Sequence, residues 1–165
     1  MNNKKKISTK GICVSAAIAA LYVAFTFLAN VLGLANNMIQ LRFSEMLCVL
    51  PIFIPSSIVG VTLGCFLSNL LLPGTVWLDI IVGPLATLIG ALGTYALRKW
   101  KWVAPMPAVI SNAAIIPFVL AYGYGMEEAI PFMMLTVGIG ELLSVYGFGS
   151  YLILKGDKLL KGLQN

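Results

Sequence analysis

The sequence predicts an all-α membrane protein, and two observations carry this prediction. The chain of 165 residues is 59% hydrophobic and only 10% charged, whereas soluble domains carry roughly a quarter charged residues. Its mean hydropathy is +0.94, and its apolar residues gather into long runs, of which a helical span needs roughly 20 residues. This is more apolar surface than one soluble core can bury. We therefore expect one transmembrane domain over residues 1–165, built as a six-transmembrane-helix bundle.

Turn signals divide the apolar sequence into six expected spans. They lie at about 8–29, 40–54, 56–72, 76–97, 103–122 and 129–154. The second is short and bounded by Pro51 and Pro55, so a re-entrant segment is also open there. The first run is longer than the apolar core of a signal peptide, and no small-residue cleavage site follows it, so we expect a retained span.

The cations predict the orientation of the bundle, because Lys and Arg are held on the cytoplasmic side. With six crossings and both termini cytoplasmic, ten of the 11 Lys and Arg residues fall on that side. They are Lys4, Lys5, Lys6, Lys10, Arg98, Lys99, Lys101, Lys155, Lys158 and Lys161. The eleventh, Arg42, falls on the outer side. The net charge of +5 therefore reports topology and is not the footprint of a nucleic-acid-binding protein.

Motifs for catalysis or cofactor binding are missing from the sequence. It has no histidine, no Walker-type phosphate loop, no G-x-S-x-G and no His/Cys cluster with zinc spacing. Cys13, Cys48 and Cys65 fall inside apolar runs, where a free cysteine behaves as a small hydrophobe. We therefore expect no enzyme activity, no cofactor and no metal.

Polar side chains from separate spans share the outer half of the expected bundle. They are Arg42, Glu45, Ser68, Asn69, Asp79, Asn112 and Glu141. A charge at membrane depth costs at least about 2.5–3.5 kcal/mol, so such groups persist where they line a cavity or pair with each other. Arg42 can neutralise only one carboxylate, so an incoming ligand should bring cations or N–H donors. A guanine-type base offers an N–H edge to a carboxylate and a carbonyl to Arg or Asn.

Most of these residues have a structural alternative. Arg42 and Glu45 also fit a mutual ion pair at the membrane interface. Asp79 also fits an N-cap of the fourth span. Asn69 and Asn112 also fit hydrogen bonds that hold helices together.

Glu141, in "GIGELL", is the hardest of the polar residues to explain without a ligand, because mid-depth offers it neither water nor an adjacent cation. Glu127 and Glu128, in the outer loop "GYGMEE", are expected to be ordinary solvated charges. Four aromatic residues near the outer ends could stack on a flat ring, although such belts also occur without a ligand. They are Phe43, Trp77, Tyr122 and Tyr124.

Small residues mark faces where helices can approach closely. Ala16, Ala20 and Ala24 follow each other at four-residue spacing, which fits either packing inside the bundle or docking of a partner subunit. Four glycines are expected to pack internally. They are Gly60, Gly64, Gly90 and Gly93. Transporters that alternate access alone usually have two repeats. This sequence shows no such duplication and no nucleotide motif, which favours a binding bundle driven by other chains.

The sequence resembles the QueT family along nearly its whole length. The resemblance lies in "LRFSEMLCVLPIF", "GVTLGCFLSNLL", "LDIIVGPLATLIGALGTYALRK", "PAVISNA" and "GIGELL". These proteins are substrate-binding S-components of energy-coupling factor (ECF) transporters, assigned to queuosine precursors. The resemblance implies the ECF S-component type of fold, with both termini cytoplasmic. It also implies uptake of 7-aminomethyl-7-deazaguanine or its 7-cyano form, with a transmembrane T-component and two ATPase subunits as partners.

The resemblance also implies that Ala16, Ala20 and Ala24 meet the T-component, since related S-components carry an alanine stripe there. From the side-chain chemistry we expect Glu45 or Glu141 to take the guanine-like N–H edge. Asp79 would balance an aminomethyl cation, and Arg42, Asn69 or Asn112 would meet the ring carbonyl. The loop "GLANNMIQ" (33–40) would cap the site. Two alternatives remain open, an S-component for another vitamin or nucleobase and a membrane scaffold without a ligand.

Overall fold

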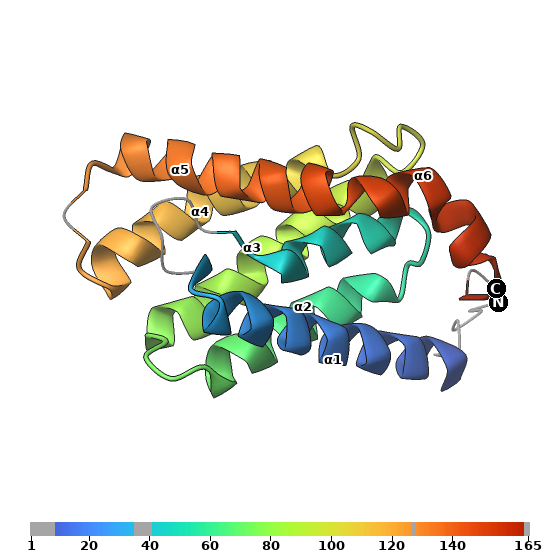
Figure 1. Cartoon of the computed structure of the whole chain (residues 1–165), viewed down its shortest axis with the longest axis horizontal. Coiled ribbons are helices and arrows are strands. Elements are labelled where there is room, and N and C mark those ends of the chain that lie inside the picture. Colours follow the sequence, from blue (N-terminus) through green and yellow to red (C-terminus); the bar gives the residue numbers. More distant parts are fainter. Residues whose placement is uncertain (1–8, 35–40, 127, 164–165) are drawn as a thin grey trace, which may run out of the picture.

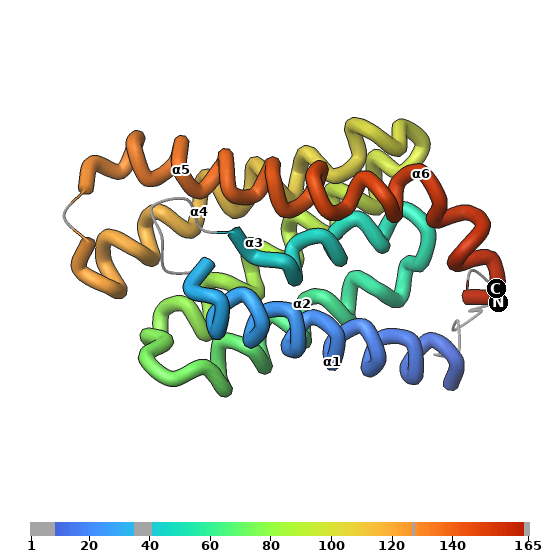
Figure 2. Tube along the Cα trace, viewed as in Figure 1, coloured from blue at the N-terminus to red at the C-terminus, as the bar shows by residue number. Residues whose placement is uncertain are grey.

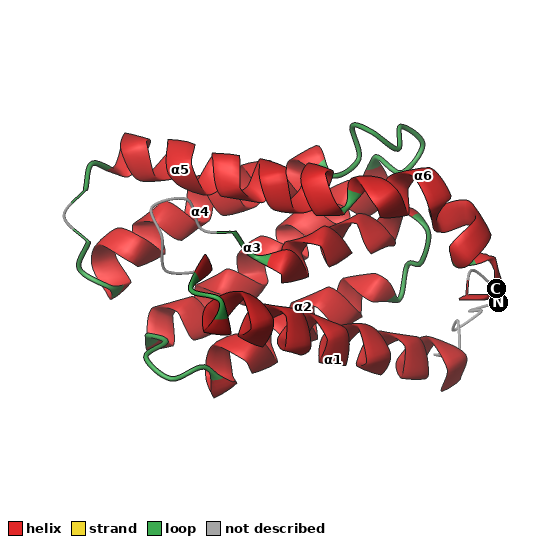
Figure 3. Cartoon of the chain, viewed as in Figure 1, coloured by secondary structure: helices red, strands yellow, loops and turns green. Residues whose placement is uncertain are grey.

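The computed structural model describes residues 9–34, 41–126 and 128–163, and within these ranges it contains helices and loops but no strand (Figure 3). Two of its elements are 3-10 helices (η2 and η4), and η3 is a π-helix. The elements in chain order are α1 (Thr9–Val31), η2 (Phe43–Ile52), α2 (Ser57–Leu71), α3 (Trp77–Ala96), α4 (Met106–Gly123), α5 (Ile130–Leu142), η3 (Leu143–Phe148), α6 (Ser150–Leu159) and η4 (Lys161–Leu163).

The helices lie side by side along the long axis of the molecule (Figure 1). Among the described residues, four helical segments are long and apolar enough to cross a membrane: α1, α3, α4 and the run Ile130–Leu159, which joins α5, η3 and α6. Two shorter apolar helices, η2 and α2, complete a set of six segments. Each of the six overlaps one expected span. The chain is thus a multi-pass helical membrane protein.

One end of the bundle gathers both described chain ends and most of the cations. Helix α1 begins there and α6 ends there (Figure 2). The α3–α4 connection is held at the same end, because Lys101 pairs with Asp157 of α6 and the Tyr146 hydroxyl donates to the carbonyl oxygen of Trp102 at 2.7 Å. We call this the cationic end of the bundle. Its Lys and Arg residues are Lys10, Arg98, Lys99, Lys101, Lys155, Lys158 and Lys161.

Helix η2 is an internal element and not a full-length span. Its 10 residues rise by about 2.0 Å each and so reach roughly 20 Å, against a hydrocarbon core of about 30 Å. It contacts α1, α2, α3, η3 and α6, and eight of its ten residues are buried. Pro51 lies inside it and lacks the N–H that a longer helix would use. The expected span at 40–54 therefore corresponds to a short helix in the centre of the bundle, which brings Arg42 and Glu45 among the other helices.

Glycines set the close contacts between neighbouring helices, as the sequence predicts. A Cβ at Gly60 would lie 2.8 Å from the Ser15 carbonyl oxygen, and one at Gly64 would lie 2.5 Å from Tyr22 Cβ, so α2 packs directly on α1. A Cβ at Gly90 would lie 2.6 Å from Ala108 Cα, which brings α3 equally close to α4. Gly93 packs in the same way against Pro107.

Gly64→Ala is expected to lower the free energy of unfolding by about 1–3 kcal/mol, the usual cost of overpacking. The new methyl group would meet the Cβ of Tyr22, which cannot move away because the residue is buried and its hydroxyl is bonded to Glu45. Gly138→Ala is the matched control, since its Cβ would meet only Ala113 Cβ at an ordinary 3.5 Å. Thermal unfolding of both variants in detergent checks this. Equal midpoints for the two variants would contradict it.

Candidate functional site

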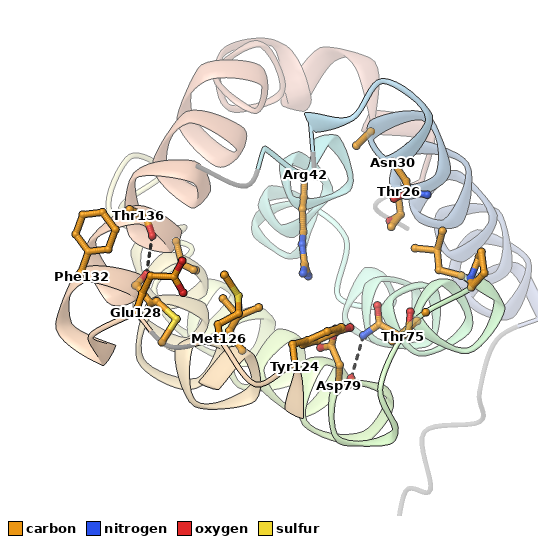
Figure 4. A pocket seen from close by; sticks show the side chains of 18 residues that line it. Thr26, Asn30, Arg42, Thr75, Asp79, Tyr124, Met126, Glu128, Phe132 and Thr136 are labelled. Carbon is orange, nitrogen blue, oxygen red and sulfur yellow. Dashed lines mark hydrogen bonds between the residues drawn. The ribbon is translucent and has the colours of Figure 1, made fainter. Parts of the chain in front are cut away.

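A cavity of about 530 Å³ lies at the end of the bundle opposite the cationic end, and Figure 4 shows it with helices around it. This volume is within the range of small-molecule sites. Arg42, Asn69 and Asp79 line it, so three of the six predicted ligand residues meet there. The other lining residues come mainly from α1, the α2–α3 connection, the α4–α5 connection and α5. The polar ones among them are Thr26, Asn30, Thr75, Tyr124, Glu128 and Thr136.

Asp79 is a buried carboxylate that the fold presents to this cavity. It stands in the first turn of α3 and is only 5% exposed. The N-cap of that helix is Val76 and no side chain caps it, so the capping alternative for Asp79 is wrong. Its Oδ2 accepts a hydrogen bond from the Tyr124 hydroxyl at 3.2 Å, and its main-chain oxygen accepts one from Asn69 Nδ2 at 3.0 Å. Its Oδ1 has no hydrogen-bond partner within the described part of the chain.

Tyr124 stands beside Asp79 in the α4–α5 connection (Figure 4). Burial, together with the nearby charge of Asp79, raises the pKa of its phenol above the ordinary value of 10.0. The phenol therefore keeps its proton at neutral pH and can donate to Asp79. The other three aromatic residues do not line the cavity. Trp77 and Tyr122 are 71% and 76% exposed, and Phe43 packs edge-on against Phe148.

Arg42 reaches the middle of the cavity from the start of η2 (Figure 4). Its main-chain N–H donates to Ser144 Oγ at 3.2 Å, and Ser144 in turn donates to the carbonyl oxygen of Gly140 at 2.8 Å. Ser144 belongs to the π-helix η3, an irregularity that often accompanies functional sites. Among charged groups, Asp79 acts most strongly on the guanidinium, followed by Glu45. Arg42 thus has two carboxylates near it, Asp79 at the cavity wall and the buried Glu45.

Glu45 is buried beneath the cavity and does not line it. Its Oε1 accepts the Tyr22 hydroxyl and its Oε2 accepts the Cys48 thiol at 3.1 Å, so both oxygens already have donors. The prediction that Glu45 takes the ligand's N–H edge is therefore not supported by this geometry. Sequence reasoning missed Tyr22, although a tyrosine inside an apolar helix usually needs a polar partner for its hydroxyl.

Glu141 and Asn112 are also buried and lie outside the cavity wall, at 5% and 3% exposure. Glu45, Arg42 and the Asn112 amide act electrostatically on the Glu141 carboxyl, which places all four groups close together. Glu141 Oε2 has no hydrogen-bond partner among the described residues. A buried carboxylate oxygen without a donor is costly. Buried polar side chains thus extend from the cavity into the bundle, as far as Glu141.

Glu128, in the outer loop, has a place that the sequence did not predict. It is exposed, as a solvated charge should be, but it lines the cavity and lies across from Arg42 (Figure 4). Glu127 and residues 35–40, most of the expected capping loop, lie outside the described residues.

The alanine stripe of α1 faces away from the bundle. Ala16, Ala20 and Ala24 are all exposed, whereas Ile18 and Tyr22 on the opposite side of the helix are buried. The alternative that the stripe packs inside the bundle is therefore wrong. It forms a smooth face on the outside of the molecule.

The fold and the cavity define a multi-pass membrane protein with a polar chamber built between its helices. Residues 12–158 match the family described as QueT transporter, and the chain belongs to this family. It is 32% identical over 168 residues to the queuosine precursor transporter QueT of Lactococcus lactis subsp. cremoris (strain MG1363), with 95% of this chain and 96% of that protein covered. No solved structure matches the chain.

Proposed function

We propose that the chain is the substrate-binding S-component of an ECF-type importer for a queuosine precursor base. The substrate would be 7-aminomethyl-7-deazaguanine or its 7-cyano form. The observation that carries this proposal is the cavity between helices, lined by Arg42, Asn69 and Asp79, in a chain of the QueT family. ATP hydrolysis would come from two ATPase subunits through a transmembrane T-component, since the sequence holds no nucleotide motif.

Asp79 and Arg42 are the residues that we propose to touch the ligand. Asp79 Oδ1, which has no hydrogen-bond partner within the described residues, can accept an N–H from the base or the aminomethyl cation. The Arg42 guanidinium carries only donors and suits the ring carbonyl. Tyr124 lies against Asp79 and offers its ring as a flat surface for stacking.

The remaining predicted residues would act by holding these two groups in place. Asn69 fixes the start of α3 through the Asp79 main-chain oxygen. The Glu45 and Glu141 side chains lie near the Arg42 guanidinium and would hold it in place at membrane depth. Asn112 lies beside Glu141 and joins α4 to this group. In this assignment Asp79 replaces Glu45 and Glu141 as the carboxylate that meets the base.

The exposed stripe of Ala16, Ala20 and Ala24 would be the face that meets the T-component. Small side chains let a partner helix approach closely, which is how helices associate inside a membrane. The cationic end of the bundle would face the cytoplasm, because the cytoplasmic side collects Lys and Arg. Both termini would then be cytoplasmic and the cavity would lie toward the outside.

A ligand panel on purified protein tests the substrate. The 7-aminomethyl or 7-cyano base, at 100 times its Kd, is expected to stabilise the protein by about 2.7 kcal/mol in a thermal-shift measurement. Biotin, riboflavin and thiamine should give no shift. Stabilisation by one of these vitamins alone would assign another cargo. A chain that no ligand stabilises, and that co-purifies without an ATPase pair, would be a scaffold.

A further inference from the structure

A second cavity of about 540 Å³ lies on the side of the bundle. It shares no residue with the cavity that Arg42, Asn69 and Asp79 line. One wall is α1, with Cys13, Ala17 and Leu21, and the floor is η2. The other wall runs from Phe148 through α6 to Leu163. Its lining is almost wholly apolar. We call it the lateral groove.

The lateral groove is long enough to span only about one half of a membrane core. Along α1 it extends from Cys13 to Phe25, 12 residues that rise by 1.5 Å each and so span about 18 Å. Half of a hydrocarbon core of about 30 Å is about 15 Å. A transmembrane helix that docked along its whole length would need a groove of about 30 Å. The length of this groove instead matches one lipid leaflet, on the side of the cationic end.

Cations stand where the groove meets the cationic end of the bundle. Lys10 is three residues before Cys13 and seven before Ala17, so it lies on the same face of α1 as the groove lining. Lys155 is four residues after Tyr151 on the opposite wall, and its Nζ lies 5.2 Å from the centre of the Tyr151 ring. Both lysines are exposed. Asp157, the nearest acidic residue along α6, is paired with Lys101.

We propose that the lateral groove binds an anionic phospholipid. One acyl chain lies between α1 and α6, and the phosphate group lies between Lys10 and Lys155. Basic pockets between helices on the cytoplasmic side of membrane proteins are suited to anionic headgroups, and the cationic end is the end that we propose faces the cytoplasm. Each lysine near the membrane surface strengthens such binding about fivefold. The site goes beyond the proposed transport function, because it uses neither Asp79 nor Arg42.

Native mass spectrometry of the full chain in detergent, without any deazaguanine, tests this proposal. Dioleoyl phosphatidylglycerol and dioleoyl phosphatidylcholine carry the same acyl chains and differ in headgroup charge. We expect the parent to retain phosphatidylglycerol at least tenfold more tightly. Lys10→Gln with Lys155→Gln should remove about 25-fold of this affinity and leave phosphatidylcholine unchanged. Lys99→Gln, at the same end but outside the groove, is the charge control.

Filling the groove gives a second measurement. Ala17→Trp places an indole in the groove and should abolish retention of both lipids, whereas Ala114→Trp, on the exposed side of α4, should behave as the parent. If Ala17→Trp fails to fold, the lysine variants decide alone. Equal retention of the two lipids by the parent would overturn the proposal. So would an Ala17→Trp variant that keeps its lipid but loses its protein partners. A failed ligand panel with lipid preference intact would refute only the proposed substrate.

Discussion

Asp79→Asn is expected to weaken binding of the 7-aminomethyl base by about 2–4 kcal/mol, roughly 30- to 700-fold in Kd. The side chain is buried, and its Oδ1 lacks a hydrogen-bond partner among the described residues. Asparagine keeps the shape and can still accept the Tyr124 hydroxyl, but it carries no charge. A primary alkyl amine is protonated at neutral pH, so it loses its counter-charge in this variant. Isothermal titration calorimetry on purified protein measures the effect.

The 7-cyano base separates two roles for Asp79, because the nitrile is neutral. If Asp79 balances the aminomethyl cation, Asp79→Asn should weaken the amine far more than the nitrile. Equal losses would mean that Asp79 meets the ring N–H edge. Glu128→Gln is the matched control, since this carboxylate also lines the cavity but is exposed, and its loss should cost less than about 1 kcal/mol. Parent-like affinity of Asp79→Asn for both bases would contradict the assignment.

The helical segments were predictable because the membrane imposes a simple rule on sequence. Long apolar runs separated by Pro, Gly and charged residues become helices, and all six expected ranges overlap helical segments. Residues 40–54 are the exception. The run 40–54 is as apolar as the others, but its prolines and short length give an internal 3-10 helix. Hydropathy cannot separate a segment that is surrounded by lipid from one that is surrounded by protein.

The sequence could predict at which depth in the membrane the polar residues lie, but not which of them line the cavity. Side chains that were predicted at similar depth do lie near one another. Asp79 and Glu45 lie near Arg42, and Glu141 lies near Arg42 and Glu45. Which of them faces the cavity depends on helix rotation and on donors from other helices. Glu45 does not line the cavity, and its two carboxylate oxygens accept hydrogen bonds from Tyr22 and Cys48.

Gly83 shapes the wall of the cavity, one helical turn after Asp79. A Cβ there would lie 2.7 Å from Asn69 Nδ2 and 2.9 Å from Asp79 Oδ1, so glycine leaves the space in which these two groups stand. Gly83 also precedes Pro84 inside α3, and the proline ring disfavours helical backbone in a preceding residue that has a Cβ. A side chain at position 83 would therefore act on both the site and the backbone.

Gly83→Ala is expected to weaken binding of the 7-aminomethyl base by about 1–3 kcal/mol, roughly 5- to 150-fold in Kd, because overpacking would displace the carboxylate and amide of the wall. Gly138→Ala, which makes the same chemical change where its Cβ has room, should bind as the parent does. The double variant Gly83→Ala with Pro84→Ala keeps the new methyl group but removes the pre-proline conflict. Its affinity should stay low if the methyl group crowds Asn69 and Asp79. Recovery of parent affinity in the double variant would assign the loss to the backbone of α3, and Asp79 Oδ1 would then not need the space that Gly83 leaves.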